Sequence, residues 1–160
     1  MKLLLMILCT GLLALGQSSS DIVFWPAAKL KNYSSVLKTT QNTKKSLTAS
    51  EILSDLGHYK FEILRRDVSG AGELHKNWTD VFVVQGGEAT MLYGGKLEDE
   101  RDTGNGELRG PKVVGGKSQK LAAGDVLVMP PGVAHQALVE PGKSFFTLIV
   151  KVQDKVQTKN

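Results

Sequence analysis

The chain has 160 residues, of which 41% are hydrophobic, and a formal net charge of +4 at pH 7. Its lysines are scattered, and Lys44-Lys45 is the densest pair, so the sequence lacks the basic stripe with aromatics that typifies nucleic-acid binding. We therefore expect no nucleic-acid partner. The single cysteine, Cys9, lies in a segment that we expect to be removed, which excludes thiol catalysis in the mature chain.

Residues 1–16 have the pattern of a secretory signal peptide. Lys2 is positive, Leu3–Leu15 is almost wholly apolar, and the small residues Ala14 and Gly16 precede an expected cleavage site before Gln17. The apolar run is about 13 residues long, too short for a hydrocarbon core that takes about 20. The pattern predicts a secreted or periplasmic protein without membrane association after cleavage.

Residues 17–57 are predicted to form an extension of one strand and short helices. Asp21–Trp25 is a short apolar run that predicts an edge strand. Pro26 suits the first turn of a helix that would continue through Leu37, and the polar stretch Thr39–Ser46 predicts a loop. Thr48–Glu51 has the spacing of a capping box, which predicts a second short helix through Leu56.

Residues 58–153 have the texture of an all-β domain, and the polar residues 154–160 are expected to form a flexible tail. Tyr59–Arg66 alternates apolar and polar residues, as a strand with one buried face does. Short β-rich runs bounded mostly by glycine or proline follow, and their number predicts a sandwich or a barrel. These runs are Asp80–Val84, Ala89–Tyr93, Val113-Val114, Lys120–Ala122, Val126–Met129, Ala134–Val139 and Phe145–Val152.

The most informative segment is Gly124–His135, with the sequence GDVLVMPPGVAH. Its glycine and aspartate predict a tight turn into a buried strand, and the Pro-Pro-Gly that follows ends that strand. His135 then begins the next strand, where its side chain can point into a barrel. The spacing G-x5-P-x-G-x2-H resembles the second motif of the cupin superfamily, although Val139 stands in place of the motif's final asparagine.

The first cupin motif is matched in part. His75 corresponds to its first histidine, Asn77 stands where the second belongs, and Asp80 stands about one residue before the glutamate position. Gly70 is displaced by one residue, whereas Gly87 follows Asp80 at the motif's distance. The resemblance covers Tyr59–Val152, and it implies a cupin-type antiparallel β-barrel, or jelly roll, preceded here by the short N-terminal helices.

The resemblance also implies one divalent metal ion inside the barrel. Carried over by position, the candidate ligands are His75, Asp80 and His135, with the weak neutral donor Asn77 as a poor fourth. Two imidazoles and one carboxylate can bind Fe, Mn, Zn or Ni and leave positions open for a substrate. Trp78, Gln85 and Tyr93 are candidate substrate-binding residues, although Trp78 and Tyr93 also suit a plain core.

Two main functional interpretations follow, and a third is weaker. The first is an exported, metal-dependent enzyme that acts on a small organic molecule by oxygenase, isomerase or lyase chemistry. The second is a metal-free, non-catalytic barrel that binds a small molecule, and the replacement of a histidine by Asn77 favours it. The third is a structural protein, since cupin barrels often form homodimers through sheet edges and Asp21–Trp25 could extend a neighbour's sheet.

Overall fold

The computed structural model describes residues 22–154, so the predicted signal peptide and residues 155–160 of the expected tail lie outside the described residues. The described part contains one helix and twelve strands. Their bounds are α1 (Ala27–Lys44), β1 (Thr48–Asp55), β2 (Tyr59–Arg66), β3 (Gly72–His75), β4 (Trp78–Tyr93), β5 (Lys96–Leu97), β6 (Arg101–Gly104), β7 (Glu107–Gly110), β8 (Val113–Val114), β9 (Lys117–Ala122), β10 (Val126–Met129), β11 (His135–Leu138) and β12 (Phe145–Gln153). Within residues 22–154, no helix is long and apolar enough to cross a membrane.

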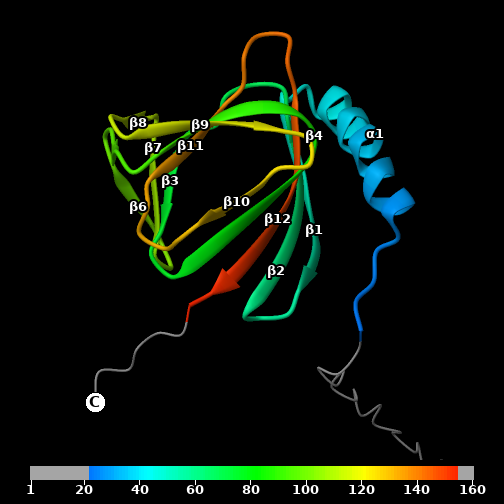
Figure 1. Ribbon diagram of the computed structural model, residues 1–160, viewed down its shortest axis with the longest axis horizontal. Helices are drawn as coiled ribbons and strands as arrows, with labels where there is room; N and C mark the ends of the chain where they lie inside the picture. The colour runs from blue at the N-terminus through cyan, green and yellow to red at the C-terminus, as the bar shows by residue number, and fades with distance from the viewer. Residues whose placement is uncertain (1–21, 155–160) are drawn as a thin grey trace, which may run out of the picture.

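Ten of the strands form one antiparallel sheet that curls into a half-barrel (Figure 1). The hydrogen-bonded order is β1-β2-β12-β4-β11-β3-β7-β6, and β9 and β10 also pair with β4. The short strands β5 and β8 pair separately. This arrangement confirms the all-β, cupin-type barrel predicted from the sequence.

The long strand β4 joins the two halves of the curl. Its first half pairs with β10 and β12, and its second half pairs with β9 and β11. The runs Asp80–Val84 and Ala89–Tyr93, predicted as separate strands, belong to this single strand, which bends at Gly86-Gly87 where its register with β12 is irregular. Gly87 has a φ of 71°, and a Cβ there would collide with the carbonyl of Ser144, so the bend requires glycine.

The sheet buries a different core on each face. Inside the curl, aliphatic and aromatic side chains pack together, among them Leu64, Phe82, Met91, Phe145 and Ile149. Helix α1 lies on the outer side of the sheet beside β1 (Figure 1). Its Leu37 packs there with Ala49, Ile63 and Phe146 in a second buried cluster. Successive side chains of β2 and β12 therefore enter the two cores alternately. Because both faces of β12 are buried, its sequence is a nearly continuous apolar run.

Three details of the predicted extension are wrong. Ile22–Trp25 form no strand, although the ring of Trp25 packs against that of Phe61 with centroids 5.0 Å apart. The first helix extends to Lys44 through the stretch expected to be a loop. Leu37 and Gln41 are buried on one face of this helix, and the buried amide of Gln41 donates from Nε2 to the carbonyl of Leu47 at 2.8 Å. The expected second helix is strand β1, whose pairing with β2 buries Ala49 and outweighs the local capping signal.

Candidate metal centre

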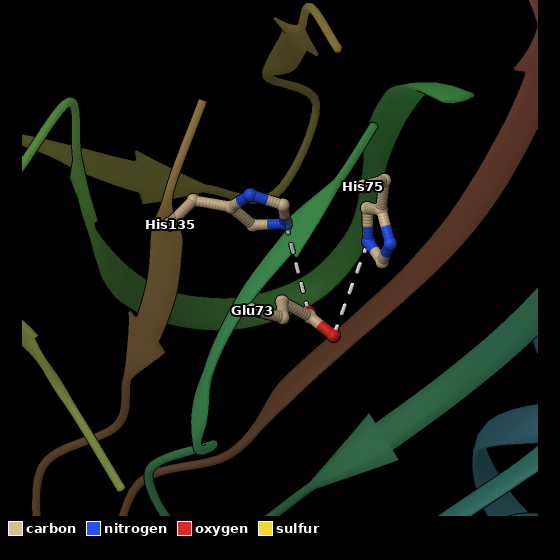
Figure 2. Close-up of side chains that lie close together, drawn as sticks. All are labelled: Glu73, His75 and His135. Atoms are coloured by element: carbon tan, nitrogen blue, oxygen red, sulfur yellow. Dashed lines mark ion pairs between the residues drawn. The ribbon is translucent and has the colours of Figure 1, made fainter. Parts of the chain in front are cut away.

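Three side chains with metal-binding atoms converge inside the curl: Glu73 and His75 from β3, and His135 from β11 (Figure 2). Glu73 and His135 are direct partners in the antiparallel register, so their side chains lie on one face. The Nε2 atom of His135 lies 3.6 Å from Oε1 of Glu73, and that of His75 lies 4.0 Å from Oε2. One ligand atom from each residue lies within 4.8 Å of the other two, which suits a single cation.

The ring of His135 is held with one nitrogen free. Its Nδ1 lies 3.0 Å from the carbonyl oxygen of Val133, which can only accept a hydrogen bond, so Nδ1 carries the proton. Its Nε2 therefore presents a lone pair, and this atom is buried without a hydrogen-bond partner among the described residues. Burial lowers the pKa of His135 to about 4, which keeps the ring neutral and able to coordinate at neutral pH.

The ring of His75 is oriented in a similar way by a carboxylate. Its Nδ1 donates to Oε2 of Glu107 at 2.6 Å, because β3 and β7 pair His75 with Glu107 in register. Arg109, which pairs with Glu73, forms ion pairs with both Glu73 and Glu107, the latter at 3.3 Å. A carboxylate behind a histidine is a common support of metal-binding imidazoles, because it fixes the tautomer and the ring orientation.

Asp80 reaches the same region but is bound by a lysine. Both of its carboxylate oxygens lie 2.8 Å from Nζ of Lys151, and Oδ2 lies 3.2 Å from Nε2 of His75. Burial raises the pKa of Asp80, but the contact with His75 and the positive charge of Lys151 outweigh it and hold that pKa below its ordinary value. The carboxylate that converges with both histidines is therefore Glu73.

The other candidate residues from the sequence lie around this cluster. Asn77 is in the turn between β3 and β4, where its Nδ2 faces Gly106, and it is outside the converging group. Trp78 begins β4, and Nζ of Lys60 lies 5.1 Å from its ring centroid. Gln85 lies at the irregularity of β4, and its side chain bonds the carbonyl of Val83. Tyr93 pairs with His135 in register and packs against the interior core.

Sequence reasoning missed four charged residues of this region: Glu73, Glu107, Arg109 and Lys151. Only Glu73 carried a usable signal, because it lies two residues before His75 in a strand and so shares its face. The other three are brought to the histidines by strand pairing that the sequence alone does not reveal.

A separate surface pocket lies away from the histidines. It is lined by residues from β4, β9 and the connections beside β11, among them Glu88, Lys120 and Lys143. Lys143 and Glu88 form an exposed ion pair at 2.9 Å across it. None of the converging ligands lines this pocket, and the metal-binding side chains lie instead in the barrel interior.

No model of a known protein family matches the chain, and no curated protein matches it. Among solved structures, it is similar to a double-stranded β-helix protein from Klebsiella pneumoniae, with 19% identity and a TM-score of 0.47 over 66% of this chain and 76% of that one. It is also similar to a cupin superfamily protein from Desulfitobacterium hafniense, with 16% identity and a TM-score of 0.47 over 67% and 78%. A third, a predicted oxalate decarboxylase from Thermotoga maritima, gives 15% identity and a TM-score of 0.49 over 66% and 80%.

The fold and the motif lead to the same assignment. The segment Gly124–His135 has the spacing of the second cupin motif, and it forms a turn, strand β10 and the start of β11 on the wall of the curl. His75 and His135 project from two paired strands into the interior. The chain is a protein of the cupin, or double-stranded β-helix, fold.

Proposed function

We propose that this protein is a metal-dependent cupin enzyme that holds one divalent metal ion on Glu73, His75 and His135. The observation that carries the proposal is the Nε2 atom of His135, which is buried without a partner among the described residues. Leaving such an atom unpaired costs about 1–3 kcal/mol, and a cation bound there would remove that cost. This nitrogen points toward Glu73 and His75, and these two residues offer the remaining ligand atoms for a metal.

The donor set fits the metals expected from the sequence. Two neutral imidazoles and a carboxylate suit Fe, Mn, Zn or Ni, and three protein ligands leave positions open. A metal bound there would supply a Lewis acid that polarises a substrate oxygen or, for iron, a centre that reacts with dioxygen. Glu107 and the carbonyl of Val133 orient the two rings, and Arg109 holds Glu73 in place.

We further propose that the substrate is a small organic acid, because Arg66 is a half-buried cation that the nearby Glu62 attracts without forming a direct ion pair. Arg66 pairs in register with Phe145, which lies in the interior core, so its side chain shares that face. Within residues 22–154 it forms no ion pair within 4.0 Å, and its Nε is buried without a partner. Gly70 leaves room for the guanidinium, since a Cβ there would collide with it. A guanidinium group binds a carboxylate well, because its planar N–H donors match the two carboxylate oxygens.

The class of reaction remains that proposed from the sequence, which is oxygenase, isomerase or lyase chemistry, because one fold supports all three. The signal-peptide pattern of residues 1–16 supports the further proposal that the protein acts outside the cytoplasm, in the periplasm or beyond.

Metal content is the direct test. The purified protein would be analysed by mass spectrometry beside the variants Glu73→Ala, His75→Ala and His135→Ala. His58→Ala is the matched control, since His58 is exposed in the turn between β1 and β2 and bonds Gln153. We expect close to one metal ion per chain, lost in the three site variants and kept in the control. Absence of metal after anaerobic reconstitution would overturn the proposal and favour a metal-free binding barrel.

A further inference from the structure

Lys151 is a cation on the interior face of the curl. It lies on β12, where it pairs in register with Asp80 on one side and Lys60 on the other. Its side chain is 19% exposed and that of Asp80 is 3% exposed. Register places Lys151 and Asp80 on one face of the sheet, and this explains why an ammonium group reaches the histidines.

The contacts of Lys151 coincide with those that a metal would make. Its Nζ lies 2.8 Å from each oxygen of Asp80 and 3.3 Å from Nε2 of His75. An ammonium group only donates. In the neutral ring of His75 the single proton lies on Nδ1, which donates to Glu107, so Nε2 carries the lone pair and accepts from Lys151. That lone pair is the one that His75 would give to a metal. Nε2 has a single lone pair, so the ammonium and the metal exclude each other there.

Lys151 also neutralises the nearest additional carboxylate. Oδ2 of Asp80 lies 3.2 Å from Nε2 of His75, close enough to approach a cation held by that nitrogen. While both oxygens of Asp80 bond Lys151, that carboxylate is compensated and its attraction for a second cation is reduced. The positive charge of Lys151 would in addition repel a dication bound at His75.

We propose that Lys151 is a built-in competitor that sets the metal affinity of this site. Its ammonium group bonds His75 and Asp80 in the metal-free protein, and a metal ion binds only by displacing it from Nε2 of His75. Removing the ammonium frees His75 and makes Asp80 available as a second carboxylate. The inference rests on the proposed metal centre at Glu73, His75 and His135 and assigns the control of its affinity.

The test is the affinity for Zn²⁺ alone, measured by calorimetry on the metal-free protein. Lys151→Met keeps an unbranched apolar side chain and removes the charge. We expect it to bind Zn²⁺ about 10- to 100-fold more tightly than wild type, the range by which groups around a metal site change affinity. In Lys151→Met/Asp80→Asn, most of that gain should be lost, because the freed carboxylate is gone. Lys143→Met, which removes an exposed lysine paired with Glu88, should leave the affinity unchanged.

The outcomes separate this inference from the proposed function. Equal or weaker Zn²⁺ binding by Lys151→Met, with thermal unfolding like that of wild type, would contradict the role of Lys151 as a competitor. The proposed metal centre would still be supported if His135→Ala loses its bound metal. Binding by Lys151→Met but not by wild type supports the competitor and overturns wild-type metal dependence. No binding by any variant overturns both. A melting curve for each variant ensures that affinities are compared between folded proteins.

Discussion

Nδ1 of His75 lies 2.6 Å from a carboxylate oxygen of Glu107, and the two residues are partners in the register of β3 and β7. The carboxylate holds the proton of the ring on Nδ1 and turns Nε2 toward Glu73 and His135. The orientation of the imidazole is thus determined by a neighbouring strand rather than by the strand that carries it.

Glu107→Gln should therefore weaken metal binding without removing a ligand. We expect a loss of about 10- to 100-fold in affinity for Zn²⁺, because the amide no longer supports a basic imidazole in one tautomer. The measurement is calorimetry on metal-free protein. Glu98→Gln is the control, since Glu98 pairs with Lys112 at the surface. An unchanged affinity in Glu107→Gln would mean that the contact does not orient the ring.

His135 should make the metal-free protein sensitive to acid. Its pKa is about 4 in the folded chain and about 6.5 when the chain is unfolded. Between these values the unfolded state binds the extra proton. The contribution of His135 to the free energy of unfolding is therefore fully present above pH 6.5 and is lost as the pH drops toward 4. The loss is at most about 3 kcal/mol at 1.36 kcal/mol per pKa unit.

This prediction is checked by urea unfolding at pH 4 to 8 in the presence of a chelator. His135→Leu should flatten the pH dependence of the unfolding free energy over that window. The same dependence in the variant would assign the acid sensitivity to another group.

Arg66→Met should remove binding of small carboxylates while sparing the fold. We expect malonate, observed by NMR titration of the metal-loaded protein, to bind at least about tenfold more weakly, as expected for loss of a charge-assisted pair worth 1.5–3 kcal/mol. The free energy of unfolding should change little, since the variant removes a half-buried charge that forms no direct ion pair among the described residues but is attracted by Glu62. Arg101→Met, on the exposed strand β6, is the control. Unchanged malonate binding would contradict an anion site at Arg66.

Gly87→Ala should destabilise the protein more than another glycine substitution at positive φ. Both Gly87 and Gly57 have positive φ, at 71° and 81°, but a Cβ at Gly57 would meet nothing within 4 Å. Gly57→Ala should cost about 1 kcal/mol for backbone strain. Gly87→Ala should cost about 1–3 kcal/mol beyond that, because the backbone of β4 must move away from the carbonyl of Ser144 to make room for the added Cβ. Equal melting temperatures for the two variants would contradict the close approach.

Much of the fold could be predicted because its signals are local. The Gly124–His135 spacing, the alternation of Tyr59–Arg66 and the run Phe145–Val152 each correspond to a strand or turn of the structure. The capping-box pattern at Thr48–Glu51 is also a local signal, and the helix that it predicted is wrong. It is a local preference worth about 1 kcal/mol, and pairing with β2 and burial under α1 outweighed it.

The sequence by itself determined the cupin-like barrel and pointed to His75, Asp80 and His135, since motif spacing along one chain carries that information. Only the tertiary structure decided which charges meet those histidines. Glu107 and Arg109 on β7 and Lys151 on β12 are far from His75 in the chain, and antiparallel pairing sets them beside it. Partners in a sheet are chosen by burial and register across the whole domain, so a charge that no motif contains can occupy the centre of the site.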